Sequence, residues 1–206
     1  MTDTRHPTEY RQQLRERIVD TAARAFATRG IRAVKMDDVA RQLTISKRTL
    51  YELYDNKEDL LIAVVKRYGQ QSEQRMMEHV EKSSNVIEIL LYAYRQKVEE
   101  FNATVPEFYT DLVKYPRVMS LLQSSRVNHQ AQLMQFFQRG VGEGYFRADI
   151  DYDVVIFLFD AIGQQVMSRQ LYRQYSIEQL FKNLVFTSFR GLCTQKGAEV
   201  LDQNLS

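Results

Sequence analysis

The sequence has little of what forms turns, crosslinks or membrane spans. Its 206 residues include only 8 Gly and 3 Pro, which favours long helices joined by few turns. The single cysteine, Cys193, excludes an internal disulfide and fits a reducing compartment. The longest apolar runs, residues 60–65 and 154–159, are six residues each, far below the roughly 20 that a membrane-spanning helix needs. The first ten residues are polar and contain no apolar signal core. We therefore expect a cytoplasmic protein with no membrane partner.

Apolar residues recur at helical spacing along most of the chain, and no strand-like alternation of useful length is present. This pattern predicts an all-α fold of about nine helices. Asp149 or Asp151 is expected to cap the eighth helix, and the tail from Lys196 is expected to be frayed. The predicted helices span residues 10–30, 35–43, 46–54, 57–82, 85–103, 106–113, 116–140, 152–173 and 176–195.

Charge and aromatic content divide the chain into two parts. Residues 1–68 contain 14 Lys and Arg against 10 Asp and Glu, whereas residues 69–206 contain 14 against 16. Only 5 of the 23 aromatic residues lie in the first part. The division suggests a basic N-terminal domain and an aromatic-rich body with separate functions, and we expect residues 1–56 and 57–206 as the two domains. An excess of four positive charges is also ordinary for a solvated surface, so charge alone does not decide between these interpretations.

The helices expected at residues 35–43 and 46–54 have the dimensions of a helix-turn-helix. Val39 and Leu50 supply apolar contacts between them, and Ala40 is small where the two helices must approach closely. Such a pair places its second helix in the major groove of DNA.

The exposed side of that second helix has the chemistry of a groove-reading surface. Two cations, a hydroxyl and a phenol suit guanine edges and phosphates, although a plain solvent-exposed face is the alternative. Glu52 follows Arg48 by one turn, so it either pairs with the guanidinium or accepts a hydrogen bond from a cytosine amino group. Lys57 is expected at a phosphate, and Tyr54 in the small core. The predicted DNA-binding residues are Lys35, Ser46, Lys47, Arg48, Thr49, Tyr51, Glu52 and Lys57.

From Arg15 to Leu61 the sequence resembles the N-terminal domain of the tetracycline-repressor (TetR) family. The matching positions are Ala22, Phe26, Gly30, Val39, Ala40, Ile45, Ser46, Thr49, Leu50, Tyr51, Tyr54, Lys57, Leu60 and Leu61. The resemblance implies a homodimeric, ligand-responsive transcriptional regulator. It also implies that helix three reads DNA, that helices eight and nine form the dimer, and that the body binds a small molecule.

Three positions depart from the pattern of the resembled family. Thr44 occupies a turn position that is usually Gly, where a β-branched residue is disfavoured if φ is positive, so the turn either keeps that strain or relaxes. Lys35 replaces the usual Ser or Thr cap of helix two, which removes a cap and offers a cation to phosphate. Leu53 replaces a residue that is often polar.

The body predicts a pocket for an apolar or aromatic ligand and a dimer interface. Each aromatic residue taken alone is most often core, but together they suit a ligand pocket. The predicted pocket residues are Tyr94, Phe101, Phe108, Tyr109, Met119 and Phe157. The predicted interface residues are Ala161, Leu180, Phe181, Leu184 and Ser188.

These features together predict a sequence-specific DNA-binding transcriptional regulator. We expect it to bind a palindromic double-stranded operator as a homodimer and to be released by a small molecule. An enzyme is disfavoured, because the three histidines are far apart and none has a partner at metal-ligand spacing, so no metal or cofactor is expected. The alternative, a helical protein-interaction module without DNA binding, would leave the cationic helix unexplained.

Overall fold

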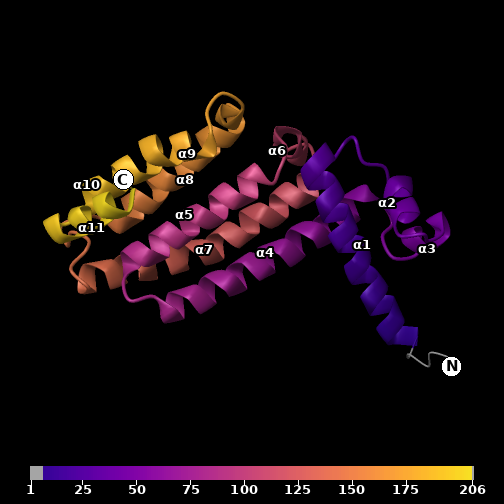
Figure 1. Cartoon of the computed structure of the whole chain (residues 1–206), viewed down its shortest axis with the longest axis horizontal. Coiled ribbons are helices and arrows are strands. Elements are labelled where there is room, and N and C mark those ends of the chain that lie inside the picture. Colours follow the sequence, from indigo (N-terminus) through magenta and orange to yellow (C-terminus); the bar gives the residue numbers. More distant parts are fainter. Residues whose placement is uncertain (1–6, 206) are drawn as a thin grey trace. The chain divides into compact units, whose positions relative to one another are not determined.

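The structure, a computed structural model, describes residues 7–205, and within them the side chains other than those of residues 7–8, 126–128 and 205. The described residues are helical, and their one sheet-like feature is a bridge between Phe146 and Cys193. None of their helices is both long enough and apolar enough to cross a bilayer. The helices, shown in Figure 1, are α1 (Pro7–Arg29), α2 (Met36–Gln42), α3 (Lys47–Tyr51), α4 (Lys57–Lys82), α5 (Val86–Asn102), α6 (Pro106–Leu112), α7 (Pro116–Gly142), α8 (Tyr152–Ser168), η1 (Leu171–Arg173), α9 (Ile177–Leu180), η2 (Phe181–Phe186), α10 (Thr187–Leu192) and α11 (Gln195–Leu205).

The all-α prediction is confirmed, and the helices up to α7 follow the predicted ranges within a few residues. Asp151 caps α8 as predicted, because its carboxylate accepts from the N–H groups of Asp153 and Val154. The eighth helix ends earlier than expected, since Gln170 adopts a left-handed φ of 52° and a short 3-10 turn follows.

The C-terminal end differs most from the sequence-based expectation. The predicted ninth helix contains a π-helical segment, η2, between α9 and α10. The prediction of a frayed tail is wrong, because residues 195–205 form α11. Leu201 of that helix is fully buried, and burial of an apolar side chain of this size contributes about 1.5–3 kcal/mol.

The chain forms two compact units that are each discontinuous in sequence. The first unit combines residues 1–72 with residues 103–121, and the second combines residues 73–102 with residues 122–206. α6 and the start of α7 therefore belong to the same unit as α1, α2 and α3.

The first unit has a small core under the two short helices. α1 packs against α2 and α6, and α2 packs against α3. Phe26 and Leu50 are almost completely buried in this core. Tyr54 is also buried, as predicted, and the Arg15 guanidinium lies 5.8 Å from the centre of its ring.

The second unit has an aromatic core between α5, α7, α8 and the C-terminal helices. The Phe137 ring stacks on Tyr152 at 4.7 Å and on Phe189 at 5.9 Å. Gly140 is required beside this core, because a Cβ atom there would lie 2.1 Å from the Phe146 ring. Most of the aromatic residues that the body contributes at helical spacing are thus structural.

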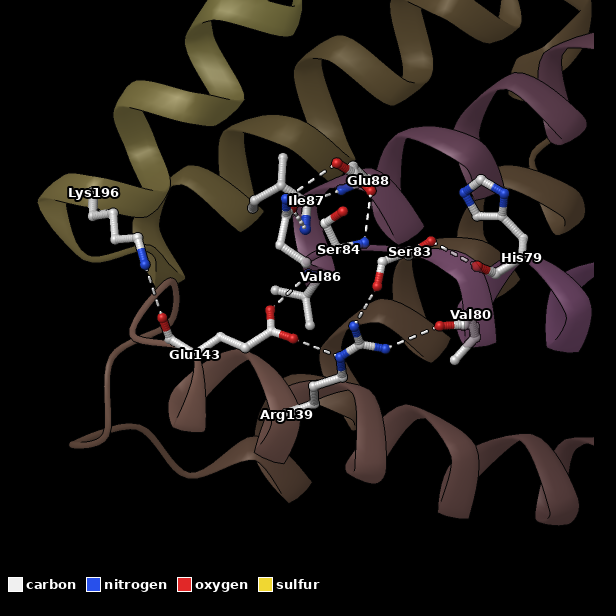
Figure 2. Close-up of polar contacts among 11 residues, drawn as sticks. His79, Val80, Ser83, Ser84, Val86, Ile87, Glu88, Arg139, Glu143 and Lys196 are labelled. Atoms are coloured by element: carbon white, nitrogen blue, oxygen red, sulfur yellow. Dashed lines mark hydrogen bonds and ion pairs between the residues drawn. The ribbon is translucent and has the colours of Figure 1, made fainter.

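Arg139 of α7 and Glu143, the residue just after α7, hold the turn between α4 and α5 (Figure 2). The Arg139 guanidinium donates to the carbonyl oxygens of Val80 (3.1 Å) and Ser83 (2.8 Å) at the end of α4. It also donates to Glu143 Oε1 at 2.6 Å. The second carboxylate oxygen of Glu143 accepts from the N–H of Val86 at the start of α5 (2.9 Å). This Arg139–Glu143 pair supplies partners to backbone groups that a helix end leaves without them.

Candidate DNA-binding site

The start of α2 is stabilised by a carboxylate instead of a hydroxyl cap. Lys35 is the N-cap residue, and its ammonium has no acceptor to offer the backbone. In return, Asp38 Oδ2 accepts from the Lys35 N–H at 3.0 Å. This backbone hydrogen bond lowers the pKa of the Asp38 carboxyl. Lys35 itself is exposed, so its predicted contact with phosphate remains open to it.

The turn between α2 and α3 keeps a left-handed residue at Thr44. Its φ is 56°, so the turn keeps the strain of a left-handed β-branched residue and does not relax. The N–H of Thr44 donates to Arg41 O (3.1 Å) and that of Ile45 to Ala40 O (3.0 Å). These bonds fix the turn despite a strain of about 1–2 kcal/mol for an L-residue in this region.

Ser46 begins α3 as a hydroxyl cap. Its Oγ accepts from the N–H of Thr49 at 3.0 Å and lies 2.8 Å from Thr49 Oγ1. The α-helix ends at Tyr51, three residues before the predicted end, and Glu52 is its C-cap. Leu53 and Tyr54 then turn into the core, which accounts for the apolar residue at position 53.

The exposed face of α3 has the predicted pairing. Arg48 Nε donates to Glu52 Oε1 at 2.9 Å, and the Arg48 side chain is 89% exposed. Lys47 forms an ion pair with Asp37 of α2, which ties the two helices together on the solvent side. The Tyr51 ring is 44% exposed. The face therefore presents one guanidinium, held by one carboxylate, with a lysine and a phenol beside it.

Lys57 lies at the start of α4, and its ammonium is bound within the protein. Nζ donates to the carbonyl oxygen of Ile31 at 3.0 Å and lies 3.5 Å from that of Arg32. Burial lowers the pKa of this lysine, and the carboxylate of Asp111 opposes that effect. The structure thus gives Lys57 an internal partner that its place in the sequence did not reveal.

Arg41 of α2 is a cation that the sequence analysis did not single out. Its side chain is 80% exposed and lies 3.9 Å from Asp38. A helical projection of residues 36–42 would have indicated this exposed cation.

Comparison with known proteins places this geometry in a family. Residues 18–64, which include α2, α3 and the start of α4, match the sequence profile of the bacterial regulatory proteins of the tetR family. Residues 18–64 are thus similar to the N-terminal part of TetR-family regulators. Similar proteins include the HTH-type transcriptional repressor KstR2 of Mycobacterium tuberculosis H37Rv, 26% identical over 68% of this chain and 73% of that protein. KstR2 of Rhodococcus jostii RHA1 is 27% identical over 71% of this chain and 74% of that protein.

Solved structures of TetR-like regulators share the fold. A transcriptional regulator of Saccharomonospora viridis in complex with choline covers 89% of this chain and all of its own, with a TM-score of 0.70 and 21% identity. KstR2 of Mycobacterium tuberculosis covers 88% of this chain and 96% of its own, with a TM-score of 0.58 and 21% identity. These relatives are transcriptional regulators, and the matched residues 18–64 of this chain contain the two short helices α2 and α3.

The structure divides the predicted pocket residues between the two units. Phe108, Tyr109 and Met119 lie in the first unit, where the Phe108 and Tyr109 rings meet edge to face at 5.3 Å. Tyr94, Phe101 and Phe157 lie in the second unit. The Tyr94 ring packs against Phe181 (5.2 Å) and Phe186 (4.9 Å).

Phe157 does not fit the prediction of a pocket lining. It is 73% exposed on α8, because the buried face of that helix is formed by Val155 and Ile156. A side chain with this exposure encloses no ligand within a single chain.

The structure also places the predicted interface residues in different environments, some buried in the core and some at the surface. Leu180 is only 7% exposed and Phe181 is half-buried against the core, so neither is freely available to a partner. Leu184 and Ala161 line a shallow apolar hollow of about 260 Å³ together with Ile162, Gln165, Val166 and Leu171. Ser188 donates its hydroxyl to the carbonyl oxygen of Leu184 (2.7 Å).

The described residues contain no group of three or more His, Cys, Asp and Glu side chains arranged to hold a metal ion, and His6 lies outside those residues.

Proposed function

We propose that the protein is a homodimeric repressor that binds a palindromic double-stranded operator through α3 and leaves it when a small molecule binds. The observation that supports this most directly is the exposed guanidinium of Arg48, held by Glu52 on a capped helix. An oriented guanidinium suits the two acceptors of a guanine edge, which is the commonest specific contact in a major groove.

The neighbours of Arg48 have supporting roles in this proposal. Lys47 and Tyr51 are exposed beside it and reach phosphate, while the Ser46 and Thr49 hydroxyls lie at the N-terminal end of α3, where a phosphate is favoured. Lys35 would contact a phosphate from the start of α2. Contacts of this kind fix the register of the protein on DNA, whereas base contacts carry the sequence preference.

Dimerisation is proposed to use the outer face of α8. Val154 (62% exposed), Phe157 (73%) and Leu158 (47%) form a stripe of exposed apolar side chains on this helix. Ala161 continues the stripe into the hollow that Leu184 also lines. A second copy of the chain would cover this stripe, and two copies would bring two α3 helices to two half-sites about 34–36 Å apart, or a multiple of that distance.

The second unit is proposed to bind the effector. We propose residues 1–56 as the DNA-binding domain and residues 57–206 as the ligand-binding and dimerisation part. The abundance of aromatic side chains favours an apolar or aromatic effector, to which Tyr94 and Phe101 would contribute. A choline complex of a structural neighbour supports the use of a small organic molecule in such a fold. A repressor of this kind acts in the cytoplasm, where its operator lies.

An electrophoretic mobility shift on the DNA upstream of the protein's own gene tests this proposal. We expect a complex at nanomolar protein that survives excess random DNA and moderate salt, because specific binding exceeds nonspecific binding by about 10³–10⁷-fold. Equal binding to both DNAs, or none, would reject operator recognition and favour a protein-interaction module.

A further inference from the structure

One peptide group between α1 and α2 is held at both of its polar atoms. The carbonyl oxygen of Ile31 accepts from Lys57 Nζ at 3.0 Å, and the N–H of Arg32 donates to Asp111 Oδ2 at 2.8 Å. These two atoms belong to the same peptide, Ile31–Arg32. The cation therefore lies at the negative end of the peptide dipole and the anion at its positive end. Lys57 belongs to α4 and Asp111 to α6, so two helices from distant parts of the sequence meet at one bond.

The surroundings of this peptide show that α6 is built against it. Gly30 has a φ of 82°, and a Cβ atom there would lie 2.9 Å from Glu107 Cβ and 3.5 Å from Asp111 Oδ2. The N–H of Val105, just before α6, donates to Ala27 O at 2.8 Å. Only a residue without a side chain lets α6 approach the turn this closely.

Asp111 is a buried carboxylate whose position suits this contact. Its side chain is 10% exposed, and its other oxygen accepts from Lys114 Nζ at 3.1 Å. A carboxylate so enclosed is costly unless charges and N–H donors satisfy it, which the Arg32 N–H and the two lysines do.

We propose that Lys57 and Asp111 are positioning residues that fix the helix-turn-helix for DNA binding by holding the Ile31–Arg32 peptide from α4 and α6. α2 begins at Met36, four residues after this peptide, and α2 packs against the reading helix α3. The orientation of α3 therefore depends on how this peptide is held. Lys57 then acts through the protein instead of through a phosphate, in contrast to the role that its sequence position predicted. This inference rests on the proposed operator binding.

The test uses full-length protein with Lys57→Met and Asp111→Ala, which remove the donor and the acceptor, and with Lys57→Arg and Asp111→Asn, which retain them. Hydrogen exchange of the Arg32 amide is followed by NMR, and operator binding is titrated across salt. Both removing variants should speed Arg32 exchange and weaken operator binding by about tenfold or more, as expected for a lost hydrogen bond to a charged group. The salt slope of binding should be unchanged. The retaining variants should stay within about threefold of wild type.

Lys47→Met is the matched control, because Lys47 is an exposed lysine of the reading face. It should lower the salt slope by about one and leave Arg32 exchange unchanged. If Lys57→Met instead lowers the salt slope by about one with Arg32 exchange unchanged, Lys57 is a phosphate contact and the proposal is overturned. A wild-type protein that binds no operator would reject the proposed function, whereas the exchange data would still report separately on the held peptide. If Asp111→Ala fails to fold, the comparison of Lys57→Met with Lys57→Arg decides the question alone.

Discussion

At the scale of single residues, the pose of the Arg48 guanidinium determines which base edges α3 can reach. The bond to Glu52 restricts that pose, at 2.9 Å between Nε and Oε1. The same carboxylate also repels phosphate, so α3 binds nonspecific DNA less tightly than it would without Glu52. Glu52 thereby favours discrimination over raw affinity.

Arg48→Ala should therefore weaken binding to the preferred operator by about 1–3 kcal/mol and binding to random DNA by much less. The reason is that a guanidinium at a base edge contributes only where the right base is present. Titrations of both DNAs across salt measure the difference. Equal losses on the two DNAs would mean that Arg48 contacts only the backbone.

Glu52→Ala distinguishes the two roles open to this carboxylate. If Glu52 only orients Arg48, nonspecific affinity should rise and the preference at the Arg48 base pair should weaken. If it also accepts from a cytosine amino group, a second base position should lose its preference. Binding to a set of operators, each with one base pair changed, measures both effects.

Thr44 is a residue whose conformation the sequence left undecided. With φ fixed at 56°, we expect stability to follow the tolerance for left-handed backbone, with Gly and Asn above Thr and Thr above Val. Thr44→Gly should gain up to about 1 kcal/mol, because relief of strain exceeds the added entropy of the unfolded chain. Thermal unfolding of the four proteins measures the order. A less stable Asn variant would show that the Thr44 side chain makes a contact that offsets its strain.

At the scale of helices, the Arg139–Glu143 pair decides how α4 ends and α5 begins. Its atoms satisfy two carbonyl oxygens and one N–H across a single turn. Lysine can replace arginine only in part here, because one ammonium does not offer the fork of donors that these acceptors require.

Arg139→Met should lower the free energy of unfolding by about 2–4 kcal/mol, since it leaves a partly buried carboxylate and two carbonyl oxygens without their donor. Arg139→Lys should fall in between. Arg190→Met is the matched control, because Arg190 donates to the Asp202 carboxylate at 3.0 Å. Both of these side chains are about half exposed or more (61% and 49%), so the loss of stability should stay below about 1 kcal/mol. Urea unfolding measures all three, and similar losses for Arg139→Met and Arg190→Met would contradict the assigned role.

How well the sequence predicts a helix depends on what determines that helix. Helical periodicity and local caps predicted α1 to α7, because Gly30, Ser46 and the prolines at 106 and 116 act on their own neighbours. The same signals failed for α11, whose stability comes from burial of Leu201 in a distant core. The π-helical segment of residues 181–186 has no local signature that periodicity could detect.

The candidate site divides in the same way. The pairing of Arg48 with Glu52 was predictable because Glu52, the C-cap residue of α3, follows Arg48 by one helical turn. The partner of Lys57 was not, because Ile31 is 26 residues away and meets it only after folding. The exposure of Phe157 depends on which face of α8 is buried, and an almost wholly apolar stretch does not reveal that.

At the scale of the whole molecule, the exposed stripe of α8 determines the expected assembly. Phe157→Glu should leave the chain folded and make it monomeric, because the side chain is 73% exposed within one chain but would be buried in a dimer. Operator binding should be lost with it. Light scattering and circular dichroism, measured together, test this prediction.

Leu180→Glu is the contrasting variant. Leu180 is 7% exposed, so a charge there should lower the free energy of unfolding by several kcal/mol. The expected result is an unfolded chain instead of two separated, intact subunits. A folded, dimeric Phe157→Glu protein would place the interface elsewhere.

The split of the first unit between residues 1–72 and residues 103–121 also bears on how the chain is made. A nascent chain leaves the ribosome from its N-terminus, so α1, α2 and α3 emerge well before the carboxylate of Asp111. At about 5–20 residues per second, synthesis of the 49 residues from 73 to 121 takes roughly 2.5–10 s. During that interval the Ala27 carbonyl and the Arg32 amide lack their native partners, the Val105 N–H and the Asp111 carboxylate. A growing chain, still close to the messenger that encodes it, therefore lacks a finished DNA-reading surface until Asp111 has been translated.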